Sequence, residues 1–242
     1  MIAIFEDREA LSRAAAGLFT ERAERAAARH GRCAVLLAGG ETPRRTYELL
    51  AHEPLRDRVP WGQLHLFFGD ERCVPTDDSR SNARMAYRAL LERVPVPVGQ
   101  VYPIPGDRDP WQAANEYEAL LRRFFANGAP RFDLVLLGLG VDGHTASLFP
   151  GSPVLEERER WAAVTRRAGE DIDRVTMTVP LINQAELVVF LVAGADKAAV
   201  LHELLDEEPD PRQRPARMIR PEQGELHWLL DRPAARFLRG SD

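Results

Sequence analysis

The chain has little cysteine, and what it has forms no pattern. Among 242 residues only Cys33 and Cys73 are present, 40 positions apart, with no CxxC pair and no cluster of cysteine with histidine. A disulfide framework or a zinc site is therefore not expected. Isolated cysteines of this kind fit a reducing compartment, so we expect the protein to be cytosolic.

Long apolar runs and long runs of one charge are also missing. Residues 1–5 are too short for the core of a signal peptide and are followed at once by Glu6 and Asp7. No apolar run approaches the length of a membrane span. Basic residues are spread through a chain of net charge −5, which argues against a nucleic-acid partner. We expect a cytoplasmic protein that binds neither membranes nor nucleic acids.

Lysine is nearly absent. Of 32 basic residues, Lys197 is the one lysine and the others are arginine. A GC-rich genome accounts for the bias, and chance survival of one lysine is the alternative to a function for Lys197. Lys197 follows Gly194-Ala195-Asp196 at the expected start of a helix, just after an apolar run. A compact ammonium there can meet a phosphate where a guanidinium does not fit.

Short apolar runs alternate with longer helical patterns along the chain. Several runs have no polar alternation, which indicates strands buried on both faces, hence a mostly parallel sheet with helices on each side. We predict an α/β fold in which residues 1–242 form a single domain, and residues 95–110 are an ordered crossing loop. The expected strands are 33–37, 64–68, 132–137, 162–165, 175–179, 187–192 and 226–230, and the expected helices are 10–29, 44–51, 82–93, 111–125, 195–205 and 233–238.

Ligands of such sheets bind at the carboxyl ends of the strands. After the strand that ends at Leu37 come Gly39 and Gly40, with Thr42 as a candidate N-cap of the next helix. Paired glycines let the backbone approach a ligand, and the free N–H groups of a helix start favour phosphate. Glu41 opposes phosphate there unless its side chain points to solvent. An ordinary tight turn is the alternative.

Two further strand ends carry polar groups. Asp70-Glu71-Arg72 follows residues 64–68, and Arg72 is suited to bidentate binding of phosphate or carboxylate, or else to a local ion pair on the surface. His144 follows a glycine turn after residues 132–137 and has the intrinsic pKa of a general base, with Asp142 placed to orient its ring. A structural role in the loop is the alternative for His144.

The segment Gly138 to Gly143 formally matches GxGxxG after a strand. A dinucleotide site requires a helix next, and Pro150-Gly151 interrupts the chain a few residues later, so we reject a nicotinamide cofactor. Ser147 lacks the flanking glycines of a nucleophile elbow and is not expected to be a nucleophile.

Taken in order, the motifs resemble the 6-phosphogluconolactonase family over nearly the whole chain. The matching stretches are GGETP (39–43), GDERCVP (69–75) with Ser81-Asn82, GLGVDGHTASLFP (138–150), RVTMTVP (174–180), GADK (194–197) and the region from Pro215 to Trp228.

This resemblance implies a Rossmann-like three-layer fold shared with sugar-phosphate isomerases and deaminases. It implies hydrolysis of 6-phospho-D-glucono-1,5-lactone to 6-phosphogluconate, the second step of the oxidative pentose phosphate pathway, without metal or cofactor. The substrate is then a small phosphorylated sugar lactone, and we expect a monomer or a small homo-oligomer. The implied general base is His144, with Arg72, Lys197 and the Gly40–Thr42 turn around the phosphate or the developing charge. The substrate-binding residues expected from the matching stretches are Gly39, Gly40, Thr42, Asp70, Asn82, Arg174 and Lys197.

The chain departs from the family at Ala38 and Glu41, where serines are common, so the contribution of this turn to phosphate binding stays open. Two other functions compete with the lactonase. A glucosamine-6-phosphate deaminase would carry an acidic relay residue five positions after the histidine, where this chain has Phe149. A sugar-phosphate sensor would need an attached DNA-binding segment, for which we find no pattern.

Overall fold

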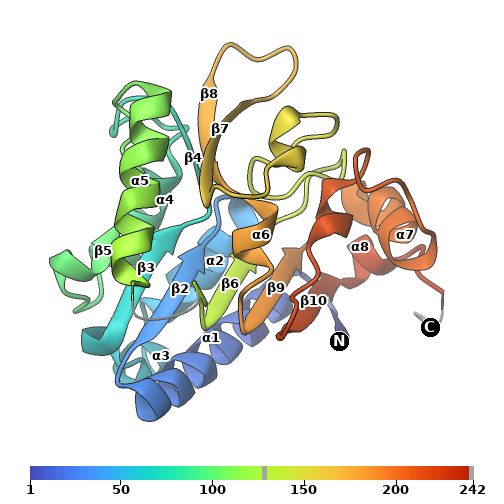
Figure 1. The fold of residues 1–242 in the computed structure, drawn as a ribbon. Helices are drawn as coiled ribbons and strands as arrows, with labels where there is room; N and C mark the ends of the chain where they lie inside the picture. Colours follow the sequence, from blue (N-terminus) through green and yellow to red (C-terminus); the bar gives the residue numbers. More distant parts are fainter. Residues whose placement is uncertain (127–129, 240–242) are drawn as a thin grey trace.

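A parallel sheet of seven strands forms the centre of the molecule (Figure 1). The structure is a computed structural model, and it describes residues 1–126 and 130–239. The strand order is β1-β10-β9-β6-β2-β3-β5, and each neighbouring pair runs parallel. The strands are β1 (Ile2–Phe5), β2 (Cys33–Leu37), β3 (Leu64–Phe68), β5 (Val101–Tyr102), β6 (Leu134–Leu137), β9 (Leu187–Val192) and β10 (Glu225–Asp231).

Helices cover both faces of this sheet, which explains the apolar strand sequences. Every side chain of β2, β6 and β9 is buried. In Figure 1, α1 (Arg8–His30) and α2 (Glu41–Leu50) lie behind the strands, and α5 (Pro110–Phe124) and α6 (Val179–Ile182) lie in front of them. The predicted α/β fold with a mostly parallel sheet and helices on both faces is therefore confirmed.

A second, antiparallel sheet of three strands stands above the first. It consists of β4 (Asp70–Arg72), β8 (Asp173–Met177) and β7 (Ala162–Arg166), in that order. The sequence predicted strands near 162–165 and 175–179 but did not predict that they form a sheet of their own. The short connection 167–172 requires β7 and β8 to pair antiparallel, because a parallel pair needs a much longer crossover.

The start of α2 differs from its prediction. The helix begins at Glu41, and its N-cap is Gly40, with φ 103° and no side-chain capping bond. The prediction that Thr42 caps this helix is wrong, because Thr42 already lies in the first helical turn. Ser81 does cap the helix that follows it, since its hydroxyl accepts a hydrogen bond from the Arg84 N–H at 3.1 Å.

The remaining elements are short. The predicted loop 95–110 contains β5, whose two residues are too few to show a strand pattern in the sequence. The other helices are α3 (Leu55–Arg58), α4 (Asn82–Ala86) continued by a π-helical turn (Tyr87–Leu91), α7 (Ala198–Asp206) and α8 (Arg232–Ala235), and the 3₁₀ turns are Trp61–Gln63, Val98–Gln100, Pro153–Glu156, Ala195–Lys197 and Pro215–Met218.

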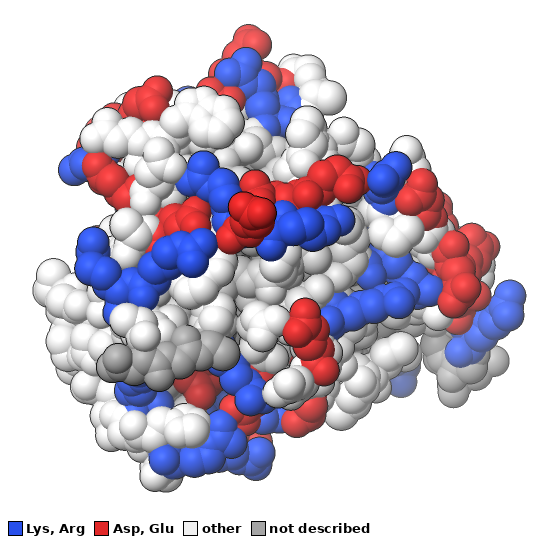
Figure 2. Space-filling model, viewed as in Figure 1, with Lys and Arg blue, Asp and Glu red and all other residues white. Residues whose placement is uncertain are grey.

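Charges of both signs are mixed over the surface. On the face shown in Figure 2, Lys and Arg alternate with Asp and Glu, and neither sign occupies a large area alone. Within residues 1–126 and 130–239, no helix combines the length and the apolar character needed to cross a membrane.

Candidate active site

A cavity of about 400 Å³ opens where the carboxyl ends of β2, β6 and β9 face the small sheet. The two sheets therefore build it together. Of the predicted site residues, all but Asp142 line this cavity: Gly39, Gly40, Thr42, Asp70, Arg72, Asn82, His144, Arg174 and Lys197.

A buried tyrosine forms hydrogen bonds with the backbone of the glycine turn that follows β2. The Tyr47 hydroxyl donates to the Ala38 carbonyl and accepts from the Ala38 N–H, each at 2.9 Å. Tyr47 is fully buried in α2, and burial raises the pKa of its hydroxyl, so it stays a neutral donor. The turn is thus fixed with its backbone facing the cavity, and the α2 helix start, which favours anions, points the same way.

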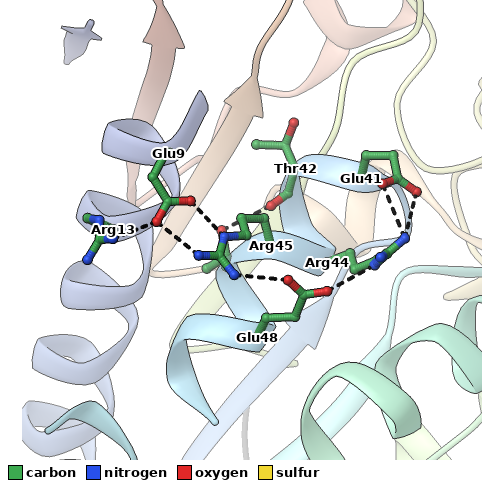
Figure 3. A network of polar contacts seen from close by, with 8 residues as sticks. Glu9, Arg13, Glu41, Thr42, Arg44, Arg45 and Glu48 are labelled. Atoms are coloured by element: carbon green, nitrogen blue, oxygen red, sulfur yellow. Dashed lines mark hydrogen bonds and ion pairs between the residues drawn. The ribbon is translucent and has the colours of Figure 1, made fainter. Parts of the chain in front are cut away.

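Glu41 lies at the rim of the cavity, and its carboxylate is exposed and paired with an arginine. Its side chain is 72% exposed and pairs with Arg44 at 3.3 Å, and Figure 3 shows it turned toward that arginine. In the same network, Arg45 makes two bonds to Glu9 of α1, of 2.7 and 3.0 Å (Figure 3). The start of α2 is therefore tied to α1, and the Glu41 carboxylate is engaged by Arg44.

His144 sits at the cavity wall with its ring held by Asp142. The imidazole Nδ1 lies 2.5 Å from Asp142 Oδ1, and the same oxygen accepts the His144 backbone N–H at 3.2 Å. The ring also packs on Phe149, with centroids 5.0 Å apart. Since Nδ1 is committed to Asp142, Nε2 is the ring nitrogen left for a ligand. It has no hydrogen-bond partner among the described residues.

Asp142 lies behind the ring and remains ionised. Burial acts to raise its pKa, but the hydrogen bond and charge of His144, together with Arg167, bring that pKa below its ordinary value. The Arg167 guanidinium lies 3.1 Å from Asp142 Oδ2. An ionised Asp142 accepts a hydrogen bond from the Nδ1–H group. When the imidazole is neutral, its lone pair is then on Nε2.

The His144–Asp142 pair needs glycine at position 140. A Cβ on Gly140 would lie 2.0 Å from His144 Nδ1 and 2.7 Å from Asp142 Oδ1. The loop 138–143 is followed by an isolated bridge between Thr145 and Leu148 and not by a helix. The GxGxxG match therefore serves to admit this side-chain pair, in keeping with rejection of a dinucleotide site.

Asp70 and Asn82 belong to a buried polar cluster. Asn82 Nδ2 donates to the Asp70 carbonyl at 2.9 Å and to its carboxylate at 3.1 Å. The Ser147 hydroxyl donates to the other Asp70 oxygen at 2.6 Å and is fully buried. Ser147 is thus a structural donor and does not line the cavity. Asn82 also closes over Gly39, where a Cβ would lie 2.1 Å from its Oδ1.

Arg72 and Arg174 face each other across the small sheet and both line the cavity. They are directly paired residues of antiparallel β4 and β8. The Nε atoms of both are buried without a hydrogen-bond partner. Like charges opposite each other destabilise a sheet, and buried donors without partners add to that cost. An anionic group placed between them would offset both terms.

Lys197 and Arg8 complete the ring of cations around the cavity. The Lys197 ammonium lies 3.1 Å from Asp196 Oδ2, and its side chain is 21% exposed. Arg8 was missed by the sequence reasoning, which considered four strand ends but not that of β1. If residues 2–5 had been counted as a strand of the sheet, the rule that ligands bind at the carboxyl ends of strands would have pointed to Arg8. Arg167 had no sequence signal, because only the folded hairpin brings it to Asp142.

Comparison with known proteins gives consistent matches over the chain. Residues 6–228 match the model of the glucosamine-6-phosphate isomerase/6-phosphogluconolactonase family. The chain is 48% identical to a 6-phosphogluconolactonase of Synechocystis, over 91% of this chain and 90% of that one. It superposes with TM-score 0.87 and 32% identity on a 6-phosphogluconolactonase of Trypanosoma brucei, covering 98% of each. A monomeric glucosamine-6-phosphate deaminase shares the fold, with TM-score 0.82 and 19% identity over 98% of this chain and 99% of that one.

Proposed function

The chain belongs to the glucosamine-6-phosphate isomerase/6-phosphogluconolactonase family, and from this premise we propose that it hydrolyses 6-phospho-D-glucono-1,5-lactone with His144 as the general base. The lactonase activity is that of its relatives. The observation that carries the role of His144 is its place at the cavity wall, with Nδ1 held 2.5 Å from an ionised Asp142.

The proposed reaction needs one proton acceptor and stabilisation of one negative charge. Nε2 of His144 removes a proton from water, and the oxygen attacks the lactone C1 carbonyl. The tetrahedral oxyanion then collapses, the bond from C1 to the ring oxygen breaks, and the imidazolium returns its proton to that oxygen. A lactone is an activated ester, so general-base help of about 10²–10⁴-fold is sufficient without a covalent intermediate.

We assign the two ends of the substrate to the two sheets. Arg174 lies beside the reacting end, since its guanidinium and the His144 ring both pack on Phe149, at 5.2 and 5.0 Å. With Arg72 it supplies positive charge for the oxyanion. Lys197 and the turn from Gly40 to Thr42 receive the phosphate, where the backbone N–H groups of the α2 start favour an anion.

The deaminase alternative lacks its relay group. The position five residues after His144 is Phe149, a buried aromatic ring that contacts the imidazole and not a carboxylate. Likeness to the deaminase structure concerns the fold. We further propose a reducing, cytoplasmic location, supported by Cys33 and Cys73, which are both free thiols.

A coupled assay tests the role of His144. Fresh 6-phosphogluconolactone is supplied, and formation of 6-phosphogluconate is followed above its spontaneous hydrolysis. We expect His144→Ala to lower kcat by about 10²–10⁴-fold, because the general base is lost. His202→Ala serves as the matched control, since that histidine pairs with Asp206 in α7 and does not line the cavity. Near-normal turnover of His144→Ala would remove the histidine from the mechanism.

A further inference from the structure

An alternating chain of charges runs from the small sheet to His144 through the hairpin loop 167–172. Arg174 Nη2 lies 2.6 Å from Glu170 Oε2, and Glu170 Oε1 lies 3.5 Å from Arg167 Nη1. Arg167 Nη2 lies 3.1 Å from Asp142 Oδ2, and Asp142 Oδ1 lies 2.5 Å from His144 Nδ1. Both ends of the chain, Arg174 and His144, line the cavity, while its middle members do not.

Phe149 fills the space that this chain encloses. Its ring contacts the imidazole of His144 at 5.0 Å and lies under the guanidinium groups of Arg174 and Arg167, at 5.2 and 5.8 Å. Arg167 thus contacts three groups, the Phe149 ring, Glu170 of its own loop and Asp142, and its side chain is 39% exposed. Among the described residues, Asp142 is the one carboxylate outside the hairpin loop with which the Arg167 guanidinium forms an ion pair.

We propose that Arg167 is a positioning residue for the general base, an inference that rests on the proposed function of His144. By binding Oδ2, Arg167 holds the Asp142 carboxylate in the orientation in which Oδ1 meets Nδ1. This fixes the plane of the imidazole and keeps the lone pair on Nε2, facing the cavity. Arg167 is not among the residues that line the cavity, so we expect it to act on the rate of the chemical step and not on binding.

The loop offers a matched control one residue away. Arg166 also pairs with a carboxylate of the hairpin, Asp173, at 2.7 Å, but its side chain is 52% exposed and has no contact with Asp142. Methionine keeps the apolar stem of arginine over Phe149 and removes the charge. Arg166→Met loses its ion pair with Asp173 of the hairpin. Arg167→Met loses a pair with Glu170 of the same hairpin and also the pair with Asp142, so only this variant affects Asp142.

Steady-state kinetics with 6-phosphogluconolactone provide the first readout. We expect Arg167→Met to lower kcat by about 10-fold with KM unchanged within about twofold, because a small misplacement of a catalytic group is costly. Arg167→Lys should recover most of the loss, and Arg166→Met should match the wild type. In an Asp142→Asn background, Arg167→Met should have no further effect, since its action passes through that carboxylate. Equal kcat values for Arg167→Met and Arg166→Met, or additive losses in the double variant, would overturn the proposal.

A substrate-free readout separates this proposal from the lactonase assignment. Nitrogen NMR of labelled histidine at about pH 8.5, where imidazole is neutral, reports which ring nitrogen carries the proton. We expect the His144 signal, identified by its loss in His144→Ala, to show protonated Nδ1 in the wild type and a mixture of tautomers in Arg167→Met. If Arg167→Met shows the same tautomer as the wild type, the positioning role of Arg167 is wrong, even if the enzyme is active. If His144→Ala keeps its turnover, the proposed function fails instead, whatever the NMR shows.

Discussion

Lys197 supplies a compact charge at the edge of the cavity, on the turn after β9. In our assignment this ammonium meets the phosphate of the substrate and not the lactone carbonyl. Loss of a hydrogen bond to a charged group costs about 1.5–3 kcal/mol, which corresponds to roughly 10- to 150-fold in affinity. The role of Lys197 can therefore be tested by comparing substrates with and without phosphate.

We expect Lys197→Ala to raise KM for 6-phosphogluconolactone by about 10- to 100-fold and to leave KM for gluconolactone nearly unchanged. The two substrates are compared in the same hydrolysis assay. Lys197→Arg is the control that keeps the charge and changes its shape. If both substrates lose affinity equally in Lys197→Ala, the ammonium does not bind phosphate.

At the residue scale, the sequence predicted which residues lie at the cavity better than it predicted which side chains contact each other. His144 and Asp142 could be paired because they stand two residues apart on a glycine loop after a strand. The clash that excludes a Cβ from Gly140 could not be foreseen, because it depends on how the ring turns back over the loop. Arg167 reaches Asp142 from 25 positions away, and only the folded hairpin makes that distance short.

At the element scale, strand ends are held by tyrosine hydroxyls from packed helices. Tyr47 of α2 bonds both polar groups of Ala38, and Tyr117 of α5 accepts from the Phe68 N–H at 2.9 Å and donates to the Tyr102 carbonyl at 3.0 Å. Both tyrosines are buried, so removing either hydroxyl leaves backbone groups without partners. Only the bonds of Tyr47 hold the turn assigned to phosphate.

We expect Tyr47→Phe to lower the free energy of unfolding by about 1–3 kcal/mol, measured by urea denaturation, because two buried backbone groups lose their partner. Its KM for 6-phosphogluconolactone should also rise, since the glycine turn is no longer fixed. Tyr117→Phe should lose comparable stability with a smaller change in KM. A wild-type KM in Tyr47→Phe would show that the turn holds its shape without the hydroxyl.

Strands were predictable where apolar residues dominate between turn residues. β2, β3 and β9 have the predicted bounds, although β3 includes the half-buried His65. The three-stranded sheet was less visible, because β4 consists of Asp70, Glu71 and Arg72, a charged triplet with no strand pattern. The carboxylate of Glu71 finds its partners only in the folded chain, where it accepts bonds from the N–H groups of Asn82 and Ala83 and from Ser81.

At the scale of the whole molecule, arginine–carboxylate pairs govern the response to acid. Hydrogen bonds from Arg45, Arg80 and Arg166 lower the pKa values of Glu9, Asp78 and Asp173, respectively. Carboxyls with lowered pKa bind fewer protons in the folded state than in the unfolded state, so their stabilisation is present above the unfolded pKa and lost as pH falls. Burial lowers the pKa of His65 from its ordinary value of 6.5. Below that pH the unfolded state binds this proton more readily than the folded state, so His65 also makes the protein less stable as pH falls.

Two carboxyls, the buried Glu71 and the half-buried Asp133, act in the opposite direction. Burial raises the pKa values of Glu71 and Asp133, so each becomes less costly to the folded state as pH falls. They are outnumbered by the carboxyls whose pKa is lowered. We expect Tm, measured by calorimetry, to decrease slightly below pH 6.5 and further between about pH 5 and pH 3, across the ordinary values of 4.5 for Glu and 3.8 for Asp.

The same scan in 1 M salt should show a shallower decrease, because most of these pairs are exposed and salt screens them. A Tm that stays constant or rises from pH 5 to pH 3 would mean that the buried carboxyls dominate.

The origin of the cavity in two separate sheets has a consequence for how the protein can change over generations. The parallel sheet is packed on both faces, and substitutions there disturb the core. The hairpin of β7 and β8 ends in a solvent-facing bend that bears Arg167 and Glu170, and such segments accept new residues readily. Substitutions in the hairpin alone can therefore change catalytic rate among descendants, while the residues that we assign to phosphate, which follow strands of the parallel sheet, stay the same.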